Sequence, residues 1–95
     1  MAAYVVLNID VTDPARFADY ARAAAATVEH YGGKYLVRGG RSEALEGSAV
    51  PKRVVILEFP TYERAREWWD SAEYHDPKLV RQTAARADTL IVQGV

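Results

Sequence analysis

Four segments with the composition of β-strands are interrupted by two segments with helical spacing, and this order limits the fold more than any other feature. The strand-like segments are short and rich in β-branched residues, and they cover residues 4–11 (YVVLNIDV), 34–39, 53–59 (RVVILEF) and 88–95 (DTLIVQGV). One helical segment separates the first two strands, and another lies between the last two. This βαββαβ order predicts an α+β domain of the ferredoxin-like type.

The helical segments carry recognisable start and stop signals. Thr12 or Asp13 can cap a first helix that has Pro14 at its first position, and the glycine pair 32–33 ends it. Pro60 and Thr61 open a second helix, which we expect to run to about residue 72. Asp76 followed by Pro77 repeats the start signal, so a short extra helix is predicted over residues 77–86. We predict one domain over residues 1–95, with an antiparallel sheet in the order 4-1-3-2 and both helices on one face.

Charge and composition exclude several classes of function. The 95 residues carry 12 basic and 13 acidic side chains, without a run of either sign, so no basic stripe for nucleic acid is present. The chain has no cysteine, which excludes disulfides and thiolate chemistry. The start, MAAYVVLNID, has the pattern of neither a signal peptide nor a membrane span. We therefore expect a cytoplasmic protein that does not bind membranes.

Because strand residues alternate between the two faces of a sheet, each strand can be divided into two sets. One set is apolar and must lie under the helices: Val5, Leu7, Ile9, Val11, Tyr35, Val37, Val55, Leu57 and Phe59. The other set is half apolar and half polar: Tyr4, Val6, Asn8, Asp10, Lys34, Leu36, Arg38, Val54, Ile56 and Glu58. A half-apolar face left open usually marks an interface. We predict a twofold homodimer in which two such sheets close on each other.

Arg38 is the least expected residue in this pattern, since it follows Tyr35, Leu36 and Val37 within one strand. If residues 41–51 form a symmetric hairpin loop, Arg38 lies near Val54 on the open face, and Lys34 lies opposite Glu58. Asn8 and Asp10 then fall at the same end, about 10 Å away across two strand spacings. Arg38 is therefore expected to meet Asp10 or Asn8, although a register slip of two residues would undo this arrangement.

Several segments closely resemble the domain-of-unknown-function family 1330 (DUF1330). The resemblance extends nearly end to end and is carried by YGGKYLVRGG, LEG, PKRVVILEFPTYERAREWWDSAEY and the closing VQGV. The positions that match the family pattern are Gly32, Gly33, Arg38, Gly39, Gly40, Gly47, Trp69, Ser71, Glu73 and Tyr74. The resemblance implies a dimeric α/β barrel, which agrees with the face analysis. It implies no reaction, because the family has no established function.

Six residues are candidates for a ligand site: Arg38, Asn8, Asp10, Trp69, Tyr74 and His30. A guanidinium offers a bidentate fork to a carboxylate or phenolate, and the alternative for Arg38 is a structural ion pair with Asp10. Asn8 and Asp10 can orient a ligand or satisfy neighbours.

The remaining candidates also have two interpretations. Trp69, which the family pattern favours over Trp68, and Tyr74 can wall an aromatic pocket, but one tryptophan must belong to the core. His30 can bind a ligand or complement the dipole at the end of the first helix. His30 and His75, without a third partner, do not make a metal site, so we expect neither metal nor other cofactor.

Three functions remain open at this point. The first is a homodimer that binds a small anionic or aromatic organic molecule in a pocket between sheet and helices or partner. The second is a cofactor-independent enzyme, a monooxygenase or isomerase acting on a small aromatic or carbonyl substrate, with Asp10, Glu58, His30 or Tyr74 as base. The third is a structural or stress-related dimer that has no ligand.

Overall fold

A computed structural model describes all 95 residues as seven elements. Along the chain these are β1 (Ala3–Val11), α1 (Pro14–His30), β2 (Lys34–Arg38), β3 (Arg53–Phe59), α2 (Tyr62–Trp69), α3 (Ala72–Ala84) and β4 (Ala85–Gln93). The four strands form one antiparallel sheet in the order β2-β3-β1-β4. The predicted α+β class and the predicted strand order are both confirmed.

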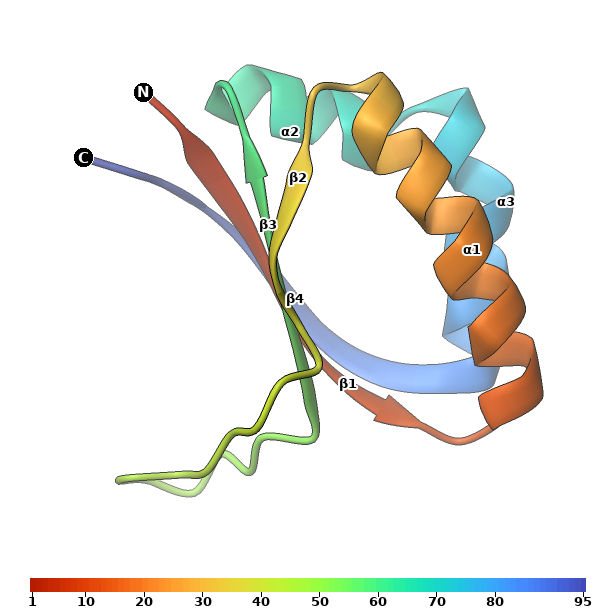
Figure 1. The fold of residues 1–95 in the computed structure, drawn as a ribbon, viewed down its shortest axis with the longest axis vertical. Coiled ribbons are helices and arrows are strands. Elements are labelled where there is room, and N and C mark those ends of the chain that lie inside the picture. The colour runs from red at the N-terminus through yellow and green to blue at the C-terminus, as the bar shows by residue number, and fades with distance from the viewer.

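All three helices cover the same face of the sheet, and the other face has no cover (Figure 1). The core lies between these two layers. Its largest fully buried side chains come from the sheet and from all three helices: Leu7, Ile9, Phe59, Val28, Trp68 and Tyr74. Hydrophobic residues at alternate positions of β1 and β3 supply the sheet side of this core, as strand periodicity requires.

The start of α1 follows its sequence signal, whereas the start of α3 does not. The Asp13 carboxylate accepts a hydrogen bond from the backbone N–H of Arg16, which is the expected N-cap arrangement. The helix predicted to begin at Pro77 begins instead at Ala72, because the Ser71 hydroxyl caps it by accepting from the N–H of Tyr74. Pro77 consequently lies inside α3, and α2 ends earlier than predicted, at Trp69.

A β-bulge in β2 changes the face of two residues. Lys34 pairs with Glu58 and Tyr35 with Leu57, but Val37 then pairs with Ile56, so Leu36 is the extra residue. An inserted residue moves everything after it to the opposite face. The prediction that Val37 faces the helices and Arg38 the open side is therefore wrong. Arg38 pairs with Val55, a residue of the helix-covered face.

Residues 39–52 leave the end of β2 as a long arm that returns to β3. The arm extends away from the body on the side of the sheet opposite the helices (Figure 1). Apart from Pro51 at its base, every residue of this arm is exposed.

Candidate functional site

An aromatic pocket lies between the sheet and α1. Its free interior volume is about 30 Å³, which is room for little more than one water molecule. A larger ligand therefore has to enter through the open mouth and push side chains of the lining apart. Its lining comes from five elements and comprises Leu7, Ile9, Phe17, Tyr20, Ala21, Tyr35, Arg38, Arg53, Val55, Leu57 and Trp68. Two arginines are the only charged residues in this lining, and no carboxylate accompanies them.

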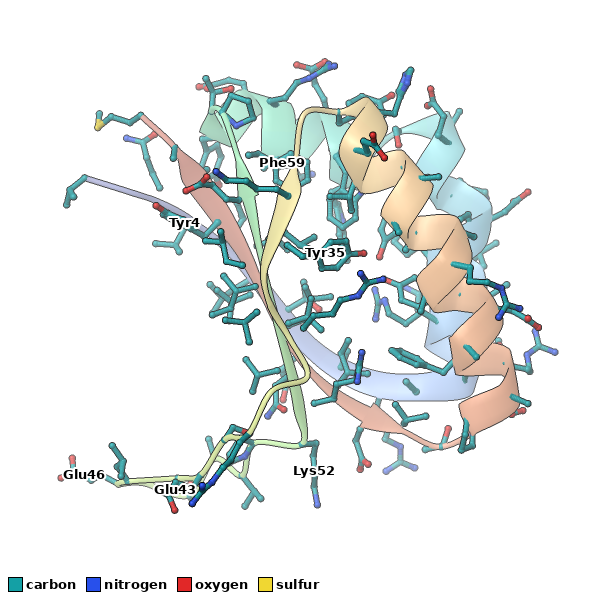
Figure 2. The ribbon with its side chains drawn as sticks, viewed as in Figure 1. Tyr4, Tyr35, Glu43, Glu46, Lys52 and Phe59 are labelled. Atoms are coloured by element: carbon teal, nitrogen blue, oxygen red, sulfur yellow. The ribbon has the colours of Figure 1, made fainter.

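Arg38 reaches this pocket because of the bulge. Its guanidinium carbon lies 4.3 Å from the ring centroid of Tyr35, a cation–π arrangement on the pocket wall. Figure 2 shows Tyr35 on the helix side of β2, facing the space under the helices. Arg38 forms no salt bridge, since the ion pairs of the chain involve other residues. Arg38 is an exposed residue, and no carboxylate of the protein neutralises its guanidinium, so the group is free to meet a ligand.

Arg53 is the second charged group of the lining. Its guanidinium carbon lies 5.5 Å from the ring centroid of Phe17, and its Nε is buried without a hydrogen-bond partner. The side chain runs over the bare Cα of Gly39, where an added Cβ would lie 2.3 Å from an Nη of Arg53. A buried donor without an acceptor normally costs about 1–3 kcal/mol. A ligand oxygen that reached Arg53 would offset part of this cost.

Tyr20 and Tyr74 form a hydrogen-bonded pair behind the pocket. Their hydroxyl oxygens lie 2.8 Å apart, and Tyr20 also lines the pocket. Burial, followed by the neighbouring Tyr74, raises the pKa of Tyr20 far above its ordinary value. Burial is also the main cause that raises the pKa of Tyr35. Both phenols are thus protonated near neutral pH, and they can donate hydrogen bonds but cannot serve as bases.

Arg81 of α3 is a third guanidinium near this region, although it does not line the pocket. It is 4% exposed, and its Nε has no hydrogen-bond partner. The guanidinium carbon lies 5.9 Å from the ring centroid of Tyr20 and 5.8 Å from that of Trp69. Arg81 also forms no salt bridge, so the interior behind Tyr20 is positively charged.

The tryptophan that lines the pocket is not the one that the family pattern favours. Trp68 is 1% exposed, lines the pocket and lies 4.1 Å from Tyr74 between ring centroids. Trp69 is half-buried outside the pocket, with the Lys78 ammonium 4.4 Å from its ring centroid. Trp68, rather than Trp69, is therefore the tryptophan that walls the pocket.

Asn8 and Asp10 lie on the open face, away from Arg38. The Asn8 amide donates to the carbonyl of Val50 at 3.0 Å and accepts from the N–H of Lys52 at 2.8 Å, so it fixes the base of the arm. Asp10 is exposed and pairs across the strands with Arg86. The expected meeting of Arg38 with Asn8 or Asp10 is wrong, because the bulge puts Arg38 on the other face. The expected pair of Lys34 with Glu58 is confirmed, with 3.1 Å between Nζ and Oε1.

His30 also lies apart from the pocket, at the exposed end of α1. Its Nε2 is 3.6 Å from Oε2 of Glu73, and the other carboxylate oxygen, Oε1, accepts a 2.9 Å hydrogen bond from the hydroxyl of Tyr31. The pKa of Glu73 is lowered, first by a hydrogen bond from the backbone N–H of Glu73 itself and then by the hydrogen bond from the Tyr31 hydroxyl. Of the six candidates, only Arg38 therefore lines the aromatic pocket. Tyr74 lies behind it, with the Trp69 ring 5.9 Å away between centroids, and Asn8 and Asp10 share a separate hollow on the open face.

Four residues of this region were missed as site candidates: Tyr20, Tyr35, Arg53 and Arg81. Trp68 was considered as a pocket wall, but Trp69 was preferred to it. Tyr20 follows Phe17 by three positions and so shares its side of the first helix, which was a usable signal. Arg53 and Arg81 gave no such signal, because a single arginine at a strand start or in a helix is ordinarily solvated.

Two further properties concern cofactors and membranes. No group of three or more His, Cys, Asp or Glu side chains is placed to hold a metal ion. None of the helices combines the length and the apolar character that a membrane crossing needs.

Comparison with known proteins gives a family and a fold. The family model described as "Domain of unknown function (DUF1330)" matches residues 2–95. No curated protein matches the chain.

Among solved structures, RPA0582 from Rhodopseudomonas palustris, a protein of unknown function, is similar with a TM-score of 0.79 at 18% identity, over 99% of this chain and 82% of that one. SnoaB from Streptomyces nogalater, a cofactor-independent oxygenase, has a TM-score of 0.72 at 13% identity, over 99% and 93% of the two chains. A conserved protein from Methanosarcina mazei has a TM-score of 0.59 at 14% identity, over 100% and 95%. At these identities the likeness establishes the fold alone.

Proposed function

Because the chain belongs to the DUF1330 family, whose description names no activity, we propose a function from its pocket: the protein binds a small planar aromatic molecule that carries an anionic group. The observation that carries this proposal is the lining itself, in which Arg38 and Arg53 stand among aromatic rings without any carboxylate. Guanidinium groups bind planar anions through two parallel hydrogen bonds and also stack on rings. An aromatic acid satisfies both preferences at once.

The position of the two arginines sets how such a ligand would lie. Tyr35 and Phe17 stand beside Arg38 and Arg53 respectively, so the anionic group belongs at this end of the pocket. Trp68 and Leu57, which are both buried, lie behind this end. The free interior of about 30 Å³ must widen before an aromatic ring can extend toward them. The protonated hydroxyl of Tyr20 would face a second oxygen of the ligand rather than remove a proton from it.

Ligand binding can be tested with 2-naphthoate as the probe and its methyl ester as the uncharged counterpart. Trp68 in the wall makes tryptophan fluorescence a suitable readout beside calorimetry. We expect the acid to bind at least tenfold more tightly than the ester, because charge-assisted hydrogen bonds contribute about 1.5–3 kcal/mol each. Arg38→Met and Arg53→Met should each remove most of this preference. Arg41→Met, in the exposed arm, is the matched control and should leave it unchanged.

Equal affinity for acid and ester in the wild type would overturn the proposal. The same conclusion would follow if Arg38→Met and Arg53→Met both bound the acid as the wild type does, since the anionic group would then lie elsewhere.

The open face of the sheet supports a homodimer as the working form. It exposes Leu36, Leu90 and Val92 to 49%, 57% and 47%, beside the half-buried Val6, Val54 and Ile56. A contiguous apolar face of this kind favours a partner, and a second copy of the same face is the simplest one. Ile56→Glu would place a charge in this contact, so sedimentation of wild type and variant tests the dimer separately from the pocket.

A second candidate is the cofactor-independent oxygenation of the same class of molecule. The fold likeness to SnoaB favours it, although only by analogy. Oxygen uptake with hydroquinone-type phenols would support this activity, provided that Arg38→Met reduces it. Absence of uptake across a panel of such phenols, in a protein that binds them, would leave binding as the function.

A further inference from the structure

Apart from Gly39, over which the Arg53 side chain runs, the arm formed by residues 39–52 has no role in the pocket. Its contacts with the body are confined to its base, where Asn8 bonds the carbonyl of Val50 and the N–H of Lys52. Loops of more than about 12–15 residues are uncommon in compact domains unless they serve a function. The arm nevertheless carries Leu45 and Val50, which are 92% and 60% exposed.

The direction of the arm is fixed by this base. Figure 2 shows Lys52 beside the end of the sheet and Glu43 and Glu46 far out on the side that the helices leave open. Tyr4, a residue of the open face, lies on the same side of the sheet (Figure 2). The arm and the apolar open face therefore lie on the same side of the sheet, and a partner bound to that face would also meet the arm.

We propose that this arm clasps a second copy of the chain and places Leu45 against it, an inference that rests on the proposed dimer of sheet faces. Two sheets that pack face to face lie about 10 Å apart. Leu45 follows Gly39 by six positions, and an extended chain advances roughly 3.3 Å per residue, so the arm can reach about 20 Å. An arm that leaves on the open side must then pass beyond the gap between the sheets and run along the partner.

The charges of the arm agree with a second copy as the occupant. Arg41 and Lys52 balance Glu43 and Glu46, so the arm has no excess charge that would select nucleic acid or an anionic membrane. At the same end of the open face, Arg86 lies opposite Asp10 in the strand register, and Asp88 lies opposite Asn8. A mixed arm and a mixed face on one chain can complement each other through a twofold axis.

The absence of cysteine makes the proposal directly testable. In Leu45→Cys, the single thiol is labelled with benzophenone maleimide, the sample is irradiated, and covalent dimers are measured and mapped by peptide mass. Leu79→Cys is the matched control, because Leu79 is a 48% exposed leucine on α3, on the helix side of the molecule. We expect covalent dimers from position 45 at several times the yield from position 79, and their loss when Ile56→Glu is added.

The outcomes separate this proposal from the dimer on which it rests. A wild-type protein that sediments as a monomer at all concentrations would overturn both. A dimer that Ile56→Glu dissociates, but in which position 45 forms no more cross-links than position 79, would overturn the arm contact and leave the sheet contact standing. In that case Leu45→Asp should also leave the dissociation constant unchanged, whereas the clasp predicts an increase of tenfold or more.

Discussion

The hydroxyls of Tyr20 and Tyr74, which are 54 positions apart in the sequence, meet at 2.8 Å in the interior and join α1 to α3. One phenol proton occupies the bond between them. Burial and the neighbouring Tyr74 together raise the pKa of Tyr20, because an ionised phenolate would be both desolvated and repelled there. This pair therefore holds two helices together, contributes Tyr20 to the pocket wall, and makes the stability of the protein depend on pH.

We predict that the free energy of unfolding falls above about pH 10 and that Tyr20→Phe makes this fall shallower. A folded-state pKa above the unfolded value of about 10 means that the contribution of Tyr20 to stability is present in full below pH 10. As the pH rises further, the unfolded chain loses the phenol proton first, and stability decreases by up to about 1.4 kcal/mol per pH unit. Urea unfolding of both proteins between pH 8 and 11 measures the difference, and parallel curves would contradict the prediction.

A second prediction concerns the indole of Trp68, whose N–H donates to the Thr27 hydroxyl at 3.0 Å in the core. Thr27→Val keeps the shape but leaves this buried N–H without an acceptor, which should cost about 1–3 kcal/mol in urea unfolding. The Thr27 hydroxyl itself donates to the carbonyl of Ala24 at 2.8 Å. Thr83→Val is the control, because the Thr83 hydroxyl likewise donates at 2.8 Å to a carbonyl three residues earlier, but it is exposed and has no second partner. It should change stability by less than about 0.5 kcal/mol. Equal losses in both variants would mean that the indole bond contributes nothing.

The fold could be predicted from the sequence because its signals are periodic. The alternation in β1 and β3 separates core from surface residues, and the pairing of Lys34 with Glu58 follows from it. The site could not be predicted to the same extent, since it depends on one inserted residue. Neither the composition nor the length of this strand segment marks the bulge at Leu36. The bulge nevertheless moves Arg38 from the open face into the pocket.

The helix boundaries show a second limit of local signals. Asp76 and Pro77 have the form of a helix start, but the Ser71 hydroxyl caps α3 five residues earlier. A helix that begins there places Tyr74 in the core. Tertiary packing thus decides between two acceptable caps. The same holds for Trp68 and Trp69, since adjacent residues on a short helix differ by about 100° in direction, and only the contact with the sheet selects one of them.

A third prediction uses the two neighbouring glycines that follow β2. Gly39 has φ +74°, and a Cβ there would lie 2.3 Å from an Nη of Arg53, whereas Gly40 has open space. Gly39→Ala should lower stability by about 1–2 kcal/mol through the left-handed backbone alone. It should also weaken the binding of 2-naphthoate, because Arg53 must move from its place over residue 39. Gly40→Ala should leave the affinity unchanged, and a Gly39→Ala variant with wild-type affinity would show that Arg53 does not hold the ligand.

The last prediction is that Arg81→Met does not destabilise the protein and can stabilise it by about 1–3 kcal/mol, the usual cost of a buried donor without a partner. Arg81 is 4% exposed, forms no salt bridge, and has an Nε without a partner, so its burial carries a desolvation cost that no carboxylate offsets. The rings of Tyr20 and Trp69 compensate only in part, since a cation–π contact contributes about 0.5–2 kcal/mol. Methionine fills similar space without charge. Arg16→Met, an exposed arginine of α1, is the control for a general change of net charge.

Binding gives this variant a second readout. Arg81 does not line the pocket, so Arg81→Met should change the affinity for 2-naphthoate by less than threefold, in contrast to Arg38→Met. A variant that lost several kcal/mol of stability would mean that Arg81 neutralises a group of the protein. A stable variant that lost binding would mean that the ligand reaches past Tyr20 to this guanidinium, and the pocket would then be deeper when occupied than when empty.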